Sequence, residues 1–309
     1  MQARTIRIGT RGSPLALAQA HEVRGRLMAA HGLPEEAFEV RIYKTSGDAI
    51  QDRPLAEVGG KGLFTKEIQE ALFAREIDLA VHSLKDMQTR LPEGLTIGAV
   101  LPREDVRDAF ISLAHASLAA LPKGAVVGTS SLRRQAQVKR IRPDVEIVGF
   151  RGNVQTRLRK LAEGVADATL LACAGLNRLG MADRITAPIE TDAILPAVAQ
   201  GAIAIEVRED DAEAGRLAAS LNHEPTALCV TAERAFLARL DGNCRTPIAG
   251  LAELAAGTLR FRGMVFSPDG AQCFETTREA PVSEAAALGH AAAEVLIEQG
   301  ANSVLWRSA

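Results

Sequence analysis

The 309-residue sequence has no long apolar run. Its longest uncharged stretch, 109–122, is 14 residues long, whereas a membrane-spanning helix needs about 20 apolar residues. The N-terminus has only a short apolar stretch, and no cleavage-like site follows it. We therefore expect a cytoplasmic protein with no membrane partner.

Cysteine is scarce, and the pairs that would form CxxC motifs are absent. The four cysteines are Cys173, Cys229, Cys244 and Cys273. This spacing excludes a disulfide framework and a zinc signature, and no set of His, Cys and acidic residues has metal-ligand spacing, so no metal is expected. The phosphate loop GxxxxGK[ST] is also absent, because the segment 59–62 resembles it only in composition.

Neither sign of charge dominates. Lys and Arg number 36 and Asp and Glu 38, and the resulting net charge of -2 disfavours a polycation built to bind nucleic acid. Of the basic residues 29 are Arg, which codon usage in an Ala-rich chain would also explain. The segment 129–160 nevertheless holds nine basic and two acidic residues, a local charge of +7, with Phe150 as its one aromatic residue. Because nucleic-acid sites interleave aromatic residues with basic ones, we expect no nucleic-acid partner.

Strands and helices alternate over the first two thirds of the chain, which favours parallel sheets with crossover helices. Strands are expected at 5–9, 38–43, 78–82, 95–100, 109–113, 125–128, 145–150, 168–173 and 202–207, and helices at 14–28, 65–75, 129–140 and 153–161. Ser13 and Asn153 are expected helix caps, and Thr129, Ser130 and Ser131 are expected to open the helix that ends near Arg140. The stretch 44–62 lacks periodicity and is expected to be a functional or mobile loop.

The pattern changes after about residue 222. A helix at 225–240, a hairpin around Pro268-Asp269-Gly270 and a helix at 283–299 indicate a small α+β unit. Three domains are therefore expected, of which the first two are α/β.

Two of the expected helices begin with hydroxyl residues beside arginine. Arg133 and Arg134 follow Ser131, and Arg11 precedes Ser13. Free N–H groups and the positive dipole end make helix N-termini anion sites, and ligands gather at the carboxyl ends of strands. Further arginines near expected strand ends and helix starts are Arg151 and Arg157. The pattern indicates a ligand with several carboxylates; the alternative is a solvated basic face.

Two other residues carry candidate chemistry. Asp86 follows an expected strand beside Lys85, where a carboxylate can hold a cationic or N–H-bearing centre or carry a proton; the alternative is a turn-capping residue. Cys244 lies in a polar turn beside an arginine, which favours the thiolate, a nucleophile or attachment point; the alternative is an incidental surface thiol. Cys173 and Cys229 are expected to be inert core residues.

Seven motifs occur together and in order. They are TRGSPLAL (10–17), VGGKGLF (58–64), AVHSLKD (80–86), GTSSLRR (128–134), RGNV with TRL (151–158), AGL with RLG (174–180) and LPAV with QG (195–201). In this set the sequence resembles the hydroxymethylbilane synthase, or porphobilinogen deaminase, family. The resemblance extends from Arg4 to Leu251 and is weaker beyond it.

The resemblance implies an α/β fold in which two domains like those of type II periplasmic binding proteins face a cleft, plus a smaller C-terminal α+β domain. The implied domains are 1–101 with a return segment at 202–221, then 102–201, then 222–309. It also implies a monomeric transferase of haem and other tetrapyrrole biosynthesis. Such an enzyme condenses four porphobilinogen molecules head to tail, releases four ammonia molecules, and frees hydroxymethylbilane with water. Its primer is a dipyrromethane cofactor, one per chain, held by a thioether to a cysteine of the C-terminal domain.

The resemblance further implies residue roles. Asp86 matches the catalytic aspartate and Cys244 the cofactor cysteine. Positions that match cofactor-binding residues are Ser83, Lys85, Asp86, Thr129, Ser131, Arg133, Arg134, Arg151 and Gly152. Positions that match substrate-binding residues are Arg11, Ser13, Lys61, Phe64, Arg151, Arg157, Arg178 and Gln200. Since every ring carries an acetate and a propionate, the arginines are expected to bind these carboxylates. Asp48 lies in the loop that is expected to cover the cleft, and no role is assigned to it.

Two departures from the family pattern stand out. Gln88 replaces the usual proline two residues after Asp86, which leaves that loop less constrained. Asn243 replaces the usual glycine before Cys244, and because Asn tolerates positive φ the turn is expected to survive. The competing interpretation is a non-catalytic anion-binding protein of the periplasmic-receptor type, which would predict a signal peptide and would need neither Asp86 nor Cys244.

Overall fold

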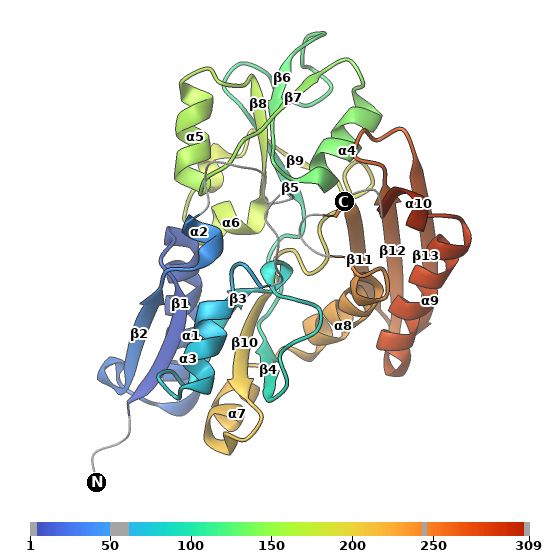
Figure 1. The fold of residues 1–309 in the computed structure, drawn as a ribbon. Coiled ribbons are helices and arrows are strands. Elements are labelled where there is room, and N and C mark those ends of the chain that lie inside the picture. Colours follow the sequence, from blue (N-terminus) through green and yellow to red (C-terminus); the bar gives the residue numbers. More distant parts are fainter. Residues whose placement is uncertain (1–4, 50–61, 243–245, 306–309) are drawn as a thin grey trace. The chain divides into compact units, whose positions relative to one another are not determined.

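The computed structural model describes residues 5–49, 62–242 and 246–305, and the chain divides into two compact units (Figure 1). Unit 1 comprises Met1–Glu104 and Ala202–Ala227, and unit 2 comprises Asp105–Gly201 and Leu228–Ala309. The three-domain division expected from the sequence stays a prediction. No described helix has the length and hydropathy of a membrane-spanning segment.

Unit 1 is built on a five-stranded sheet of order β2-β1-β3-β10-β4. Its strands are β1 (Ile6–Arg11), β2 (Phe38–Tyr43), β3 (Leu79–Ser83), β4 (Leu95–Val100) and β10 (Ile203–Arg208). β1 runs parallel to β2 and β3, whereas β10 is antiparallel to both β3 and β4. The expected parallel sheet is therefore wrong for β10, because apolar periodicity identifies a strand without fixing its direction.

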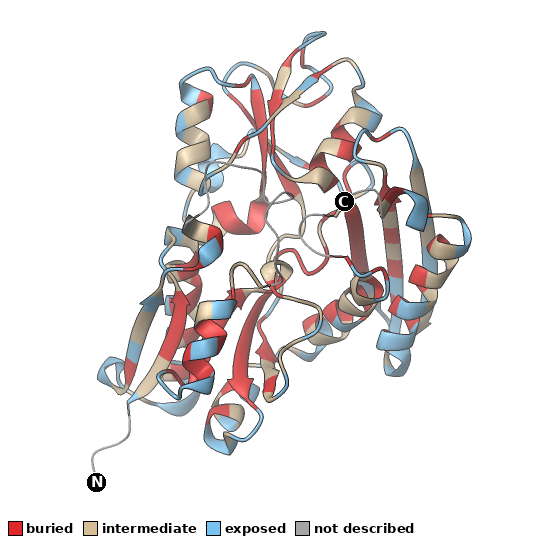
Figure 2. Ribbon diagram, in the orientation of Figure 1, coloured by how far each residue is buried: buried red, intermediate tan, exposed pale blue. Residues whose placement is uncertain are grey.

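Helices cover both faces of this sheet. They are α1 (Pro14–His31), α3 (Lys66–Phe73) and α7 (Ala212–Ala219), with short turns η1 (Glu35–Ala37), α2 (Ser46–Ala49) and η3 (Leu84–Asp86). Leu79 and Val81 of β3 pack in one core with α1 and α7, while Ala80 between them packs with α3. Figure 2 shows the buried strands between these helices.

The start of α1 follows the expected capping chemistry. Ser13 Oγ accepts a hydrogen bond from Ala16 N at 3.2 Å, and Pro14 occupies the first helical position. The helix ends at Gly32, whose φ of 63° suits glycine. The cap expected at Ser13 is thus confirmed, and it places the start of α1 beside Arg11 at the end of β1.

The expected loop 44–62 is partly wrong. Residues Ser46–Ala49 form the single helical turn α2, in which Ser46 N donates to Glu67 Oε1 at 2.9 Å. So short a turn gives no apolar periodicity and could not be recognised from the sequence. The rest of the stretch, 50–61, lies outside the described residues.

Unit 2 contains a second five-stranded sheet, of order β7-β6-β8-β5-β9. Its strands are β5 (Asp108–Ser112), β6 (Val126–Gly128), β7 (Glu146–Val148), β8 (Ala168–Ala172) and β9 (Ala187–Ile189), and its helices are α4 (Leu132–Ile141), α5 (Val154–Ala162), α6 (Cys173–Arg178) and the turn η4 (Ala182–Arg184). β6 is parallel to β7 and β8, but β5 is antiparallel to β8 and β9, so the parallel expectation is wrong here too. The cap expected at Asn153 is confirmed, because its side chain accepts from Thr156 N. Of the three residues expected to open the preceding helix, Ser131 is the cap, and it accepts from Arg134 N.

The C-terminal part of unit 2 is a three-stranded antiparallel sheet with helices. It consists of β11 (Ile248–Ala255), β12 (Thr258–Phe266), β13 (Cys273–Pro281), η5 (Val282–Glu284), α9 (Ala285–Glu298) and α10 (Asn302–Leu305), and it follows α8 (Glu224–Arg239). The hairpin expected around Gly270 is confirmed, while β11 was not expected. Ala136 of α4 packs with Ala249 and Phe266 in a shared apolar core. The α/β class with a smaller C-terminal α+β part is confirmed.

Candidate active site

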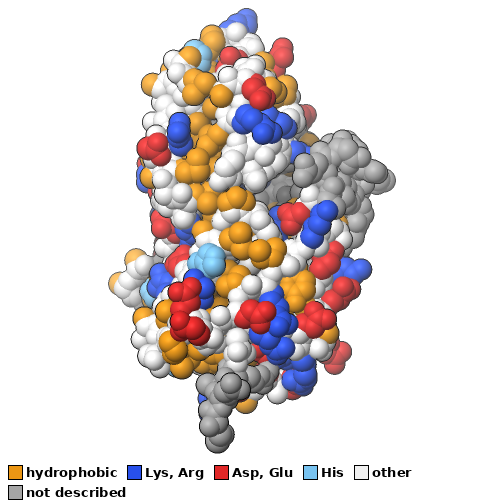
Figure 3. All heavy atoms as spheres, turned by 90° about the vertical axis from the view of Figure 1, so that its left-hand side faces the viewer, with side chains coloured by type: hydrophobic (Ala, Val, Ile, Leu, Met, Phe, Trp, Pro, Cys, Tyr) orange, Lys and Arg blue, Asp and Glu red, His pale blue; other side chains and the backbone are white. Residues whose placement is uncertain are grey.

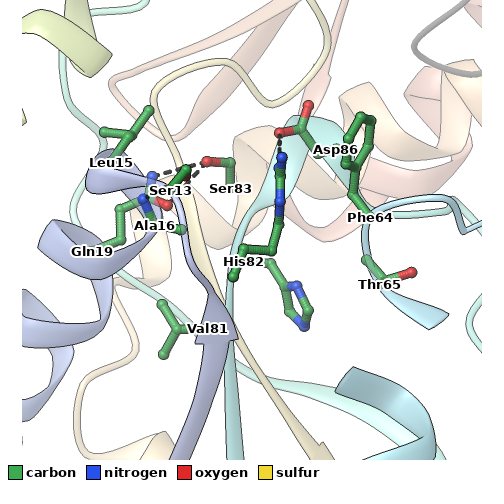
Figure 4. Close-up of a pocket in the computed structure, with 11 residues that line it drawn as sticks. Ser13, Leu15, Ala16, Gln19, Phe64, Thr65, Val81, His82, Ser83 and Asp86 are labelled. Carbon is green, nitrogen blue, oxygen red and sulfur yellow. Dashed lines mark hydrogen bonds and ion pairs between the residues drawn. The ribbon is translucent and has the colours of Figure 1, made fainter. Parts of the chain in front are cut away.

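A small polar pocket of about 60 Å³ lies in unit 1 at the carboxyl ends of the parallel strands β1 and β3. It is lined by the β1–α1 turn, by residues just before α3, and by β3 with η3 (Figure 4). Ligands of open α/β sheets gather at this edge, where loops and helix N-termini converge. Its position therefore makes the pocket the candidate binding site of unit 1.

Asp86 and Arg11 approach each other at this pocket. η3 follows β3 directly, and Arg11 is the last residue of β1, so both side chains start from strand ends. Arg11 Nη1 lies 3.8 Å from Asp86 Oδ2, which is an ion-pair distance but too long for a hydrogen bond. Among the residues that the structure describes, Arg11 is the only recorded partner of this carboxylate, and 30% of the Asp86 side chain is exposed. The Asp86 oxygens therefore have unused hydrogen-bonding capacity.

Asp48 of α2 holds the other side of the Arg11 guanidinium. Arg11 Nε donates to Asp48 Oδ2 at 3.1 Å, and Nη2 donates to Asp48 Oδ1, so the pair is two-pronged. The guanidinium also lies 4.3 Å from the ring centroid of Phe64, in cation–π contact. Asp48 accepts a further hydrogen bond from Thr45 Oγ1 at 2.7 Å. Sequence reasoning missed this role, because 37 residues separate Arg11 from Asp48.

The pair is stabilised in its charged form. Burial alone lowers the pKa of Arg11, but the hydrogen bond to Asp48 and the charge of Asp86 outweigh it and raise the pKa. Burial likewise raises the pKa of Asp48, but the hydrogen bond and charge from Arg11 outweigh it, so this pKa is lowered. Both groups are therefore ionised near neutral pH.

The hydroxyl groups of Ser13 and Ser83 lie on the side of the pocket opposite Asp86 and Phe64 (Figure 4). Ser13 Oγ caps α1, and Ser83 Oγ is hydrogen-bonded to Gln19 Nε2 at 2.9 Å. Of the expected site residues, the structure brings together Arg11, Ser13, Phe64, Ser83 and Asp86. Lys85 lies between Leu84 and Asp86 in η3.

A buried polar chain lies behind the pocket. His82, which lines the pocket, has its Nε2 3.0 Å from Glu206 Oε2, and Gln69 Nε2 donates to Glu206 Oε1 at 2.8 Å. All three side chains are buried. From the sequence Glu206 was expected only as a strand residue. Its place among apolar residues of that strand was the one signal that it pairs with a buried polar side chain.

Unit 2 holds a second candidate site, a buried pair of arginines on one carboxylate. Arg133 Nη2 and Arg134 Nη2 each lie 2.8 Å from an oxygen of Asp108, the first residue of β5. The same guanidinium groups donate to main-chain oxygens, Arg133 to Leu195 at 2.8 Å and Arg134 to Leu170 at 2.9 Å. Two cations on one anion give this cluster a net positive charge.

The electrostatics of the cluster follow from this imbalance. Burial raises the pKa of Asp108, but the charges of Arg133 and Arg134 outweigh it and hold the pKa well below its usual range. Burial lowers the pKa of Arg133, and the neighbouring charge of Arg134 adds to that effect. The Nε atoms of both arginines are buried and have no hydrogen-bond partner among the described residues. The pair therefore has two buried N–H donors that no described residue uses.

Gln200 belongs to the same cluster. Its Nε2 donates to Asp108 Oδ1 at 2.9 Å and to Val106 O at 2.7 Å, and the residue is fully buried. The preceding residue, Ala199, has a φ of 59°, which is unusual for a residue other than glycine. Its backbone N donates a hydrogen bond to Glu233 Oε2. The structure thus places Gln200 behind the arginine pair, where its amide positions Asp108.

Most of the remaining expected residues lie around helix starts of unit 2, and Arg178 is the last residue of α6. Ser131 caps α4 and Thr129 Oγ1 accepts from Ser131 N at 3.2 Å. Gly152 has a φ of 122°, Arg157 Nε donates to Gly152 O at 2.9 Å, and Arg178 Nη2 donates to Gly201 O at 3.0 Å. The main-chain oxygen of Arg151 accepts from Lys160 Nζ at 3.0 Å.

Two expected site residues, Cys244 and Lys61, lie outside the described residues, as does Asn243. Cys173 and Cys229 are buried, as expected for core residues, and burial raises the pKa of Cys173 to about 12. No group of three His, Cys, Asp or Glu residues within 5–49, 62–242 and 246–305 could hold a metal ion.

Part of the basic segment 129–160 makes contacts within the fold. Arg142 pairs with Asp144 and donates to Leu118 O and Leu121 O, both at 2.9 Å. Lys139 donates to Val145 O at 2.7 Å. On the face shown in Figure 3, basic and acidic side chains are interspersed and neither sign predominates.

An acid and an arginine at the strand ends of one α/β unit, and a buried arginine pair in the other, are typical of α/β proteins that bind anionic small molecules. Comparison with known proteins specifies the class further. Residues 6–216 match the family model "Porphobilinogen deaminase, dipyromethane cofactor binding domain", and residues 227–298 match "Porphobilinogen deaminase, C-terminal domain". The chain belongs to the porphobilinogen deaminase family, as the seven motifs predict.

Curated relatives support the same membership over nearly the whole chain. A porphobilinogen deaminase of Paracoccus denitrificans is 60% identical over 291 residues, which are 94% of this chain and 93% of the relative. One of Nitrobacter hamburgensis is 59% identical over 292 residues, covering 94% and 92%. Solved structures with a likeness to the chain include a periplasmic substrate-binding protein of Coxiella burnetii, at 16% identity and a TM-score of 0.42, covering 74% of this chain and 97% of that one.

Proposed function

We propose that this chain condenses four porphobilinogen molecules head to tail, with release of four ammonia molecules, and that Asp86 is its catalytic residue. Family membership supports the reaction. The observation that supports the role of Asp86 is its carboxylate, which lies at the pocket of unit 1 with no hydrogen-bond partner among the described residues and only a 3.8 Å ion pair to Arg11.

The chemistry of the reaction matches such a carboxylate. Loss of ammonia from porphobilinogen leaves positive charge delocalised onto the pyrrole nitrogen. A fixed, ionised carboxylate within hydrogen-bond reach of that N–H stabilises the charge more than it stabilises the neutral substrate, and so lowers the barrier. The same oxygens can accept the proton that leaves the new junction carbon.

Arg11 and Ser13 are proposed to bind carboxylates of the substrate beside Asp86. A guanidinium offers several N–H groups in one plane, and the hydroxyl at the start of α1 adds a donor at the positive end of a helix dipole. Phe64 supports the guanidinium by its ring contact. Binding at these groups would bring the pyrrole N–H toward Asp86.

The residues of unit 2 fit a dipyrromethane cofactor. The orphaned Nε–H groups of Arg133 and Arg134 are buried donors that suit its carboxylates, and the cluster carries a net positive charge. We propose that these arginines hold the cofactor together with Thr129, Ser131, Arg151 and Gly152 of the same unit. On the family pattern, Ser83 and Lys85 are further proposed cofactor-binding residues. Cys244 is proposed as the covalent attachment point. The bound cofactor supplies the pyrrole carbon to which the first substrate is joined.

The further substrate ligands proposed on the family pattern are Lys61, Arg151, Arg157 and Arg178. Arg157 and Arg178 have part of their guanidinium groups on main-chain oxygens, which orients the rest. Gln200 acts through Asp108 and is better described as a positioning residue. A cytoplasmic location, a monomeric state and the absence of a nucleic-acid partner stay predictions from the sequence.

The decisive test replaces Asp86 by Asn, which keeps the size of the side chain and removes its charge. We expect normal folding and retained cofactor but a loss of turnover of about 100-fold or more, because the charge that stabilises the cationic transition state is gone. Glu93→Gln, an exposed change on the segment between η3 and β4, is the control and should keep full activity. Turnover within about threefold of the unaltered protein would remove Asp86 from the mechanism.

The cofactor assignment is tested separately by intact-protein mass spectrometry. We expect a mass excess of two pyrrole units that maps to Cys244 and is absent from Cys244→Ser. A fully active protein with an unmodified mass would contradict it.

A further inference from the structure

Arg11, the proposed carboxylate-binding residue of the pocket, is already paired with the carboxylate of Asp48. The Nε and Nη2 edge of Arg11 is engaged by Asp48 through two hydrogen bonds. The remaining Nη1 faces Asp86 at 3.8 Å. An incoming carboxylate therefore meets an acidic residue on whichever edge of the guanidinium it approaches.

We propose that Asp48 is an internal competitor for Arg11, which sets the affinity of the enzyme for the substrate carboxylate that Arg11 receives. The proposal rests on the proposed role of Arg11 as a substrate ligand. Because Asp86 is needed for the pyrrole N–H, Asp48 is the group that the substrate displaces. Binding of substrate is then an exchange of one carboxylate for another.

The surroundings of Asp48 make this exchange easy. Its side chain is 28% exposed, so the displaced carboxylate is hydrated, and the hydroxyl of Thr45 at 2.7 Å remains as a donor to it. The turn α2 does not depend on the Arg11 pair, because Ser46 N is held by Glu67 Oε1 at 2.9 Å. Asp48 can therefore leave Arg11 while the backbone of α2 stays in place.

The exchange also has a use in an enzyme whose product carries many carboxylates. An arginine with no internal partner would bind each carboxylate of the growing chain tightly and slow its movement through the site. An internal carboxylate lowers the affinity for all of them by a common factor, which equals the equilibrium constant of the internal pair plus one. For a two-pronged pair that is only partly buried, we expect a factor of roughly three to ten.

The test is the steady-state kinetics of Asp48→Asn, which keeps the shape of the side chain and removes its charge. We expect KM for porphobilinogen to fall roughly three- to tenfold, with kcat within about twofold of the unaltered protein. Asp48→Ala, which also removes the hydrogen-bonding oxygens, should lower KM at least as far. Glu67→Gln is the matched control, because it alters the other acid that contacts α2 without touching Arg11, and it should leave both constants unchanged.

A double-mutant cycle with Arg11→Gln separates this proposal from the proposed role of Arg11. If Arg11 binds substrate, Arg11→Gln alone raises KM. In the Arg11→Gln background, Asp48→Asn then does not lower KM. An unchanged KM in Arg11→Gln would overturn the role of Arg11 itself. A raised KM in Arg11→Gln together with an unchanged or raised KM in Asp48→Asn would overturn the competition alone, since Asp48 would then orient Arg11 for its ligand.

Discussion

Removal of the Asp108 charge should destabilise unit 2 strongly. Asp108 is fully buried and accepts from Arg133, Arg134 and Gln200, so Asp108→Asn leaves two buried guanidinium groups beside each other without a counter-charge. Breaking a buried ion pair by removing one partner costs about 3–5 kcal/mol. At about 2–4 °C per kcal/mol, the melting temperature should fall by about 6–20 °C.

The assay is thermal unfolding at pH 7, followed by circular dichroism and calorimetry, with the cofactor content of each variant checked by mass. The control is Asp183→Asn, which removes a carboxylate whose side chain is 70% exposed beside Arg184 and should cost less than about 1 kcal/mol. The double variant Asp108→Asn with Arg134→Met should recover part of the loss, because it removes one of the two unpaired charges. A melting temperature of Asp108→Asn within about 2 °C of the unaltered protein would refute the electrostatic reasoning.

The same cluster predicts how stability depends on pH. Burial raises the pKa of Asp108, but Arg133 and Arg134 outweigh it, so the pKa in the folded state lies below the value of about 3.9 for an unfolded aspartate. A lowered pKa means that the ionised group stabilises the fold above about pH 4 and that this contribution is lost as pH falls toward the folded pKa. The melting temperature should therefore decrease as the pH is lowered from about 4, and this decrease should be less steep in Asp108→Asn.

Three further outcomes are expected. Arg151→Leu should stall elongation and accumulate enzyme–substrate intermediates on native gels, whereas the exposed Arg159→Leu should elongate normally. Gly152→Ala should lower the free energy of unfolding by about 1–3 kcal/mol, because an L residue is strained at φ 122° and the added Cβ would lie 2.6 Å from a neighbouring side chain. Thermal unfolding measures this loss, and the control is Gly149→Ala, whose added Cβ would have no neighbouring atom within 4 Å. Cys173 should resist alkylation at pH 8 in the native protein and react in urea, as peptide mass spectrometry can show, because burial raises its pKa to about 12.

Local signals in the sequence were sufficient for most of the elements. The caps at Ser13 and Asn153 have a specific chemistry, a side-chain oxygen that accepts from the third residue of the helix, and each lies where expected. For α4 the hydroxyl-rich stretch 129–131 indicated the start of the helix, and Ser131 is its cap. Strand direction has no such local signal. β10 and β5 have the apolar composition of central strands, and only pairing with neighbours far away in the chain makes them antiparallel.

The candidate sites show the same division between local and long-range information. The position of Asp86 after β3 follows from the sequence, because a strand and the turn after it are adjacent in the chain. The partners of the arginines do not follow, since Asp108 lies 25 residues before Arg133 and Gln200 lies 92 residues after Asp108. An acid at the start of an expected strand gives no sign that it is a buried counter-ion. Charge balance predicts that buried arginines have a buried acid nearby, but it does not identify which acid.

The excess of Arg over Lys has a physical cause in the described part of the chain, besides codon usage and ligand binding. Arg208 donates from one guanidinium nitrogen to Leu72 O at 2.7 Å and Ile77 O at 2.6 Å while another nitrogen pairs with Asp211. Arg142 likewise satisfies several main-chain oxygens and one carboxylate. An ammonium group is a single point and cannot reach partners on opposite sides of a plane, so lysine at these positions would leave buried carbonyl groups without donors. Arginine is therefore needed at these positions, where main-chain oxygens and an acid must be satisfied by one side chain.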